Sequence, residues 1–133
     1  MTVMDQAEIV NAIVGSLLEE RALVEDPEWD SVAVVTSVTP DCVDMTAYRY
    51  AGDAAGRATP LNSPEHQLFR DLQEATRGPD EQTWEVCIVK VERDRARGSV
   101  NFVYPREAGT WRIDPTDPRR LAETLRPCNA DFS

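Results

Sequence analysis

The sequence predicts one α+β domain over residues 1–133, with a single antiparallel sheet of four or five strands and helices packed mainly on one face. Amphipathic helical segments alternate with paired runs of β-branched residues, and each pair has a short connection typical of a hairpin. The 133 residues include 41% hydrophobic and 29% charged residues, a globular composition. The predicted order is helix–hairpin–helix–hairpin–helix.

The first predicted helix covers residues 3–23. Thr2 followed by Asp5 resembles a helix-capping arrangement, with an acid near the positive end of the helix dipole. Pro27 prevents the helix from continuing. The apolar residues recur at the spacing of one buried helical stripe: Ile9, Val10, Ile13, Val14, Leu17 and Leu18.

Two strand-like runs follow, at residues 31–39 and 42–50. The first is rich in β-branched residues, and the second ends in aromatic ones. Pro40 and Asp41 between them are typical of a tight turn, so the pair predicts a hairpin. Residues 51–62 contain glycine and other small residues and predict a loop.

The second predicted helix covers residues 63–77. Ser63 suits its N-cap, and Pro64 suits the first helical position, where a backbone N–H is not needed. The pair Gly78 and Pro79 ends the helix. This helix separates the two hairpins.

The second predicted hairpin pairs residues 83–92 with residues 99–104 around a charged turn. A short further strand is predicted at residues 111–113. The last predicted helix covers residues 118–126 and ends at Pro127. No sequence repeat supports a duplication of the two helix-and-hairpin units.

The charge of the chain is strongly negative and uneven. There are 24 acidic and 14 basic residues, giving a net charge of −10, and the first 66 residues hold 12 acids against 3 bases. Such a surface repels nucleic acid and anionic membranes. It attracts basic protein surfaces and speeds encounter with them. The charge therefore predicts a basic protein partner, and neither nucleic acid nor membrane.

Residue patterns for catalysis or metal binding are missing. His66 is the single histidine, which excludes multi-histidine metal sites. Cys42, Cys87 and Cys128 are widely spaced without a C-x-x-C pair, and the first two fall in strand-like runs where a free cysteine acts as a small hydrophobe. We therefore expect no enzyme, cofactor or metal. Reduced thiols and the lack of a signal-peptide pattern predict a cytoplasmic protein.

The densest acidic stretch, EERALVEDPEWD, is the candidate partner-binding site. Its first acids fall at a helix C-terminus, where negative charge is unfavourable, and such local conflicts are typical of functional sites. Tryptophan is enriched at interface hot spots, although the sequence slightly favours Trp29 as a cap on the sheet core over a contact role. The predicted contact residues are Glu19, Glu20, Glu25, Asp26, Glu28, Trp29 and Asp30.

Residues 63–126 resemble the YezG-like immunity proteins of bacterial polymorphic toxin systems. The resemblance is carried by the apolar pair Leu68 and Phe69, and by Trp84 at the start of the alternating strand TWEVCIVKVE. A charged turn closing at Gly98, the aromatic strand SVNFVYP and a final short helix complete it. The preceding half matches the family in layout only.

The resemblance implies an antitoxin that neutralises a cognate toxin domain, often a nuclease. The carboxylates of the acidic stretch are then expected to occupy a basic cleft in place of phosphates. Two alternatives stay open: an acidic homodimeric secretion chaperone, and a small-ligand-binding domain. The sequence leaves open whether the chain is a monomer or a homodimer.

Overall fold

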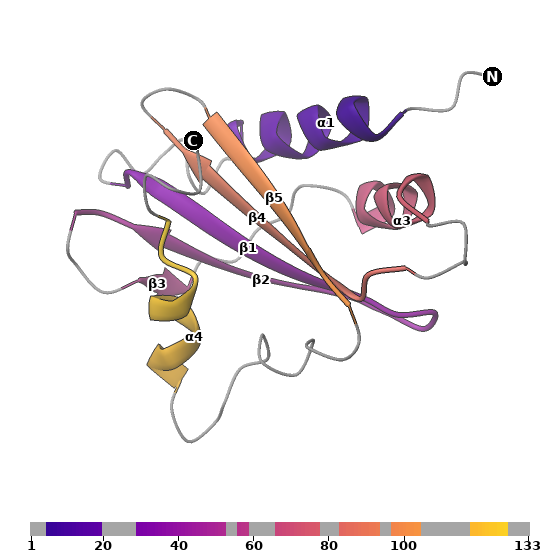
Figure 1. Cartoon of the computed structure of the whole chain (residues 1–133). Coiled ribbons are helices and arrows are strands. Elements are labelled where there is room, and N and C mark those ends of the chain that lie inside the picture. The colour runs from indigo at the N-terminus through magenta and orange to yellow at the C-terminus, as the bar shows by residue number, and fades with distance from the viewer. Residues whose placement is uncertain are drawn as a thin grey trace.

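The computed structural model describes residues 5–19, 29–52, 56–58, 66–77, 83–93, 97–104 and 118–127. These residues form one antiparallel sheet of five strands with three helices (Figure 1). The prediction of an α+β fold with a single antiparallel sheet is therefore confirmed. The elements are α1 (Gln6–Leu18), β1 (Ser31–Val38), β2 (Val43–Tyr50), β3 (Arg57–Ala58), α3 (His66–Ala75), β4 (Val86–Glu92), β5 (Arg97–Val103) and α4 (Pro118–Thr124).

The strand order across the sheet is β3-β2-β1-β4-β5, and every neighbouring pair is antiparallel. The β1–β2 and β4–β5 hairpins thus lie side by side, joined through β1 and β4. Strand β3 falls inside the predicted loop of residues 51–62. The strand predicted at residues 111–113 lies outside the described residues.

Cys42 corrects one expectation, because it belongs to the hairpin turn and its side chain is exposed. The Cys42 N–H donates to the Thr39 carbonyl at 3.3 Å, and the Thr39 N–H donates to the Cys42 carbonyl at 2.9 Å. These bonds close the turn one residue before β2 begins. Cys42 therefore does not act as a core hydrophobe, whereas Cys87 in β4 is buried as expected.

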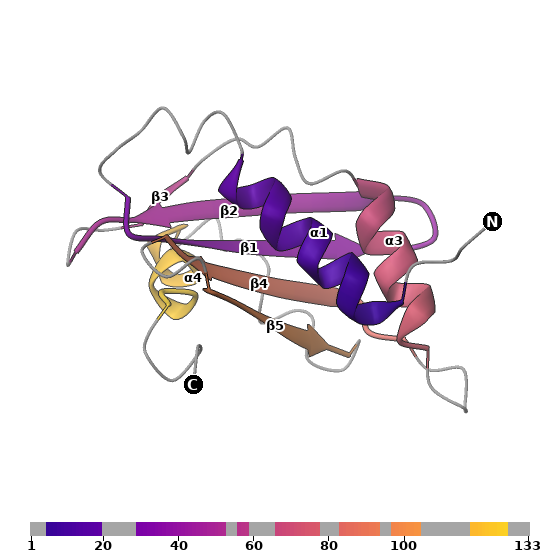
Figure 2. The ribbon, with the colours of Figure 1, turned by 90° about the horizontal axis from the view of Figure 1, so that it is seen from above.

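Helices α1 and α3 cover one face of the sheet, which we call the α1/α3 face (Figure 2). Asp5 is the N-cap of α1, and its side chain accepts a hydrogen bond from the Glu8 N–H at 2.9 Å. Thr2, the expected cap, lies outside the described residues. The buried side chains of this face come from both helices and alternate strand positions: Ile9, Ile13, Leu17, Val32, Val34, Val38, Phe69, Leu72, Cys87, Val89 and Val91.

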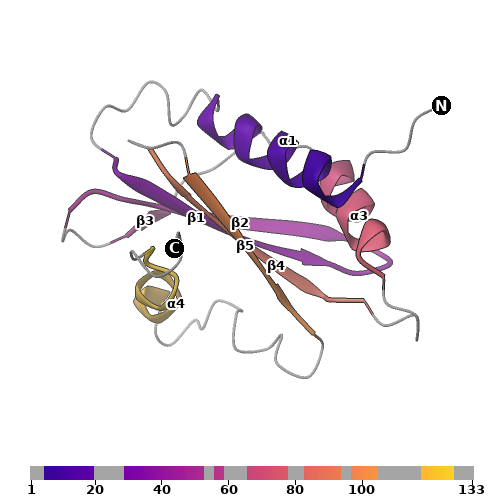
Figure 3. The same ribbon diagram turned by 45° about the horizontal axis from the view of Figure 1, so that its top comes forward.

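Helix α4 packs against the opposite face, the α4 face (Figure 3). Its buried cluster takes the other alternate positions of the strands together with residues of α4 and the residue that follows it: Ala33, Val35, Tyr48, Tyr50, Val86, Ile88, Val103, Leu121, Ala122 and Leu125. Helices therefore lie on both faces, two on one and one on the other. The run VAVV in β1 is buried without a break, as in strands that are covered on both sides.

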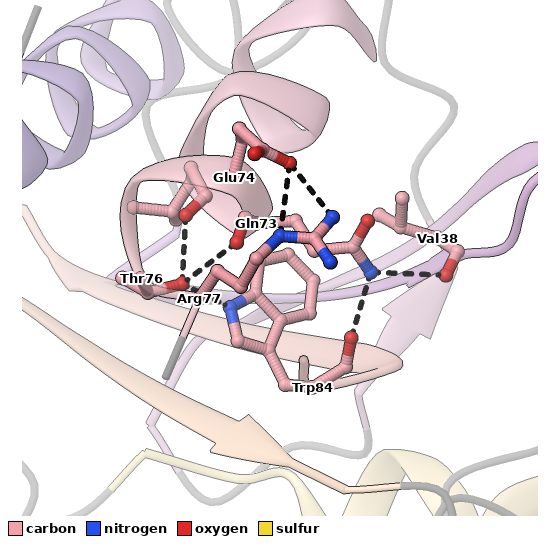
Figure 4. A network of polar contacts seen from close by, with 7 residues as sticks. Val38, Gln73, Glu74, Thr76, Arg77 and Trp84 are labelled. Carbon is pink, nitrogen blue, oxygen red and sulfur yellow. Dashed lines mark hydrogen bonds and ion pairs between the residues drawn. The ribbon is translucent and has the colours of Figure 1, made fainter. Parts of the chain in front are cut away.

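A hydrogen-bond network fastens the C-terminal end of α3 to the sheet (Figure 4). The Gln73 side-chain amide donates to the Trp84 carbonyl at 2.7 Å and to the Val38 carbonyl at 3.4 Å. The Trp84 indole N–H donates to the Thr76 hydroxyl at 2.8 Å. The network gives the indole N–H of Trp84, a residue that is only 1% exposed, a hydrogen-bond partner. It therefore orients α3 on the sheet in addition to the apolar contacts of that helix.

Candidate partner-binding site

The structure describes three of the seven predicted contact residues. Glu19 and Asp30 are exposed, whereas the Trp29 side chain is only 4% exposed. The C-terminal end of α1 and the start of β1 lie toward the same end of the sheet (Figure 2 and Figure 3). The remaining four lie outside the described residues: Glu20, Glu25, Asp26 and Glu28.

Glu19 is the C-cap of α1. Its backbone N–H donates to the carbonyls of Gly15 and Leu17, which closes the last turn of the helix. The last turn contains no basic residue, so the negative end of the helix dipole and the Glu19 carboxylate have the same sign. This arrangement slightly destabilises the helix and places negative electrostatic potential at the surface beside the C-terminal end of α1.

Asp30 is held where three strands meet. Its N–H donates to the Tyr50 carbonyl at 2.7 Å, and its own carbonyl accepts from the Arg93 N–H at 2.9 Å. Its carboxylate accepts a hydrogen bond from the Gly52 N–H at 2.5 Å. The carboxylate is thus exposed to solvent yet fixed in position, a geometry that lowers the entropy lost when a partner binds.

Trp29 belongs to the core of the α1/α3 face. The guanidinium of Arg93 lies over its ring, 5.2 Å from the centroid, and one Arg93 nitrogen donates to the Trp29 carbonyl at 3.5 Å. The burial agrees with the core interpretation of Trp29. We therefore leave the Trp29 side chain out of the contact surface.

The sequence did not predict the polar corner that carries Asp30. Arg126 lies over the Tyr50 ring, 5.0 Å from the centroid, and donates to the Gly52 carbonyl at 3.1 Å. It also forms an ion pair with Glu123 at 2.9 Å. The Tyr50 hydroxyl donates to the Ala122 carbonyl at 2.6 Å. Because the contacts that join Tyr50 to Ala122 and Arg126 to Gly52 span more than 70 positions, no local sequence pattern could have revealed them.

Two groups of this corner titrate away from their ordinary range. Burial raises the pKa of Tyr50, so its hydroxyl remains a hydrogen-bond donor at neutral pH. The hydrogen bond from Arg126 lowers the pKa of Glu123, which keeps that carboxylate ionised. Neither group therefore changes its protonation state near neutral pH.

We next consider the potential metal ligands and nucleophiles among the described residues. No group of three or more potential metal ligands lies together among them. Burial raises the pKa of the Cys87 thiol to about 12, so the thiol is protonated and unreactive at neutral pH. His66, the first residue of α3, is exposed at the helix start. Among the described residues, this end of the sheet provides two exposed carboxylates, Glu19 and Asp30, of which that of Asp30 is held by a hydrogen bond.

No protein-family model and no curated protein sequence matches the chain. Within the described residues, no helix has both the length and the apolar composition needed to cross a bilayer.

Proposed function

We propose that this protein is an immunity protein that neutralises a cognate toxin domain by placing an acidic surface against a basic site on the toxin. The contact surface is the acidic stretch from Glu19 to Asp30, without the buried Trp29 side chain. The expected partner is a folded domain with a phosphate-binding cleft, such as a nuclease.

The observation that carries the proposal is the exposure of Glu19 at the end of α1 and of Asp30 at the start of β1. Asp30 is held by hydrogen bonds with Tyr50, Gly52 and Arg93. Glu19 closes a helix without a basic residue in its last turn. The chain between them adds Glu20, Glu25, Asp26 and Glu28. Arg21 is the single base within this stretch.

The proposed mechanism is electrostatic occupation of the toxin's cleft. Fixed carboxylates can accept the hydrogen bonds that arginine and lysine would otherwise donate to substrate phosphates. The net charge of −10 also steers a basic partner toward the protein and raises the association rate. Because the screening length is about 10 Å at ~0.1 M salt, the association rate should fall as salt increases.

A tagged pull-down from the native cell tests the proposal. The bound material is washed at low and at high salt, and the retained proteins are identified by mass. We expect a single stoichiometric partner with a basic domain, released more readily at high salt.

Two outcomes would contradict the proposal. Recovery of several unfolded secreted proteins would favour a chaperone, which holds segments rather than a folded domain. Retention of a partner whose release is insensitive to salt would exclude the electrostatic mechanism, because exposed charge contacts are screened by salt. In the second case, an apolar surface would have to carry the binding.

A further inference from the structure

The backbone of Gly52, shortly after β2, connects the Asp30 carboxylate to Arg126. The Gly52 N–H donates to Oδ2 of Asp30 at 2.5 Å, and the Gly52 carbonyl accepts from the Arg126 guanidinium at 3.1 Å. These two groups belong to the peptide units on either side of the Gly52 Cα. Gly52 has a φ of 55°, and glycine has more freedom to leave such a conformation than any other residue. The contact with Arg126 therefore restrains the direction of the N–H that holds Asp30.

The Arg126 guanidinium is itself fixed by other contacts. Its Nε and Nη2 donate to the two carboxylate oxygens of Glu123 at 3.1 and 2.9 Å, a bidentate pair. Its plane lies over the Tyr50 ring, 5.0 Å from the centroid. The planar fork directs the remaining nitrogen, Nη1, at the Gly52 carbonyl. The ammonium of a lysine could not make this set of contacts, because it lacks the fixed fork geometry.

Helix α4 holds the same part of the chain at a second point, Gly56. The hydrogen bond from Arg126 is the main cause of the lowered pKa of Glu123, and a hydrogen bond from the Gly56 backbone adds to it. Gly56 also lies close to Tyr50, because a Cβ at this position would be 2.7 Å from the ring. Helix α4 lies beside β3, the strand that follows Gly56 (Figure 1 and Figure 3). The segment that contains Gly52 is thus attached to α4 and the residues just after it at two positions.

The Asp30 carboxylate keeps one oxygen for a partner. Oδ2 accepts from Gly52, whereas Oδ1 accepts no hydrogen bond from the residues that the structure describes, and Asp30 is exposed. A surface side chain that samples several rotamers loses entropy when a partner orders it. Because Oδ2 is anchored, Oδ1 is presented to the solvent in one direction before any partner arrives.

We propose that Arg126 is a positioning residue of the partner-binding site. It acts through the Gly52 peptide groups and holds the Asp30 carboxylate in the orientation that meets a basic side chain of the partner. This role rests on the proposed function, in which Asp30 is a contact residue of the acidic surface. A cation from the C-terminal part of the chain is then required for the full affinity of an acidic site.

Simple electrostatics predicts the opposite effect of removing Arg126. A cation beside an acidic surface reduces its attraction for a basic partner, so the charge effect of Arg126→Met is stronger binding. A positioning role predicts weaker binding, because the Asp30 carboxylate would have to be ordered during association. The sign of the effect therefore separates the two roles.

Arg70→Met is the matched control. Arg70 on α3 also donates to a backbone carbonyl, that of Thr39 at 3.2 Å. Thr39 lies in the β1–β2 turn, at the opposite end of β1 from Asp30. Both variants lose one positive charge, so they have the same net charge.

The Gly52 amide proton gives a readout that needs no partner. A hydrogen bond to a carboxylate moves an amide proton downfield in the NMR spectrum, so Asp30→Asn should move it upfield. Arg126→Met should move it most of the way to its position in Asp30→Asn, whereas Arg70→Met should leave it in place. If Arg126 served only to dock α4, Arg126→Met would change the α4 amides without moving the Gly52 proton.

A second variant guards against a folding defect in Arg126→Met. Glu123→Gln removes the negative charge that holds the guanidinium at 2.9 Å and leaves Arg126 in place. It should move the Gly52 proton in the same direction by a smaller amount. Circular dichroism and the thermal midpoint should show that both variants are folded.

Binding is measured with an arginine hexapeptide at low salt, by NMR titration of each variant. We expect Arg126→Met to bind the peptide about two- to tenfold more weakly than Arg70→Met, the loss expected when one contact side chain is no longer ordered in advance. In the Asp30→Asn background, Arg126→Met should cause no further weakening, because Arg126 acts through Asp30.

The outcomes separate this role from the proposed function. An unmoved Gly52 proton in Arg126→Met would overturn the positioning role, whatever partner the protein binds. Peptide binding by Arg126→Met that is equal to or tighter than binding by Arg70→Met would overturn it as well. If the peptide does not perturb the Glu19 and Asp30 amides of the wild type, the proposed function loses its contact site, while the Gly52 proton still decides whether Arg126 holds the Asp30 carboxylate.

Discussion

The two faces of the sheet are built in different ways. On the α1/α3 face, two helices with clear apolar stripes lie on alternate strand residues, and the buried cluster is almost wholly apolar. On the α4 face, a seven-residue helix is held by Leu121 and Leu125 and by the hydroxyl of Tyr50. The first face depends on periodicity along the chain, and the second depends on contacts between distant residues.

This contrast teaches which features a sequence can reveal. The α1/α3 face should carry most of the stability, because it buries long stripes of side chains. The α4 face should act as a joint that holds the polar corner near Asp30. Substitutions on the α1/α3 face should therefore lower the stability of the whole domain, whereas substitutions on the α4 face should act mainly on α4.

The largest effect is expected for Phe69→Ala. Phe69 is fully buried between α3 and the sheet, and truncation of a buried phenylalanine costs about 3–5 kcal/mol of unfolding free energy. Chemical denaturation followed by circular dichroism should show one cooperative transition at a lower midpoint. A loss below about 1 kcal/mol would mean that the α1/α3 face is not the main source of stability.

A smaller and more local effect is expected for Tyr50→Phe. The change removes the donor for the Ala122 carbonyl, and an unsatisfied buried acceptor costs about 1–3 kcal/mol. We expect faster hydrogen exchange at the α4 amides, with the β1 amides unchanged. Equal acceleration in β1 and α4 would show that α4 is part of the global folding unit and not a separate joint.

The smallest effects are expected at two glycines, with opposite signs. A Cβ at Gly15 would meet no atom within 4 Å, so Gly15→Ala should stabilise helix α1 by about 0.5–1 kcal/mol. A Cβ at Gly56 would lie 2.7 Å from the Tyr50 ring and 3.2 Å from Ala122. Gly56→Ala should therefore lower the thermal midpoint, whereas Gly15→Ala should raise it; equal signs would refute the assignment of crowding to the α4 face.

The predictability of the fold follows the same division. The helical stripe around Ile9 and Ile13 and the β-branched run of β1 predicted α1 and the first hairpin. Helix α1 nevertheless ends at Leu18, five residues before the predicted end at residue 23. The sequence did not predict the two-residue strand β3, or the position of α4 on the opposite face. A two-residue strand has no periodicity, and the side on which a short helix packs is decided by tertiary contacts.

The candidate site was predictable in its charge but not in its support. The acidic stretch was visible in the sequence, and Glu19 and Asp30 are exposed. The burial of Trp29 under Arg93 depends on a contact across 64 positions, so its role in the core could be weighed but not decided from the sequence. Arg126, which reaches the Gly52 carbonyl beside Asp30, gave no sequence signal.

The most direct test of the proposed function compares two double charge reversals with the same change in net charge. Glu19→Lys with Glu20→Lys alters the acidic stretch. Asp41→Lys with Asp44→Lys alters the β1–β2 hairpin at the other end of β1, about 26 Å away along an eight-residue strand, which is well beyond the screening length. Asp30 is left intact, because its carboxylate accepts a hydrogen bond from Gly52.

The measurement is the association rate of each variant with the partner recovered in the pull-down, at low salt. The proposal predicts that the Glu19 and Glu20 reversal slows association by about tenfold or more and weakens protection against the toxin. The Asp41 and Asp44 reversal should slow association much less, because it changes only the overall charge. Equal effects of the two reversals would contradict a contact site at the acidic stretch.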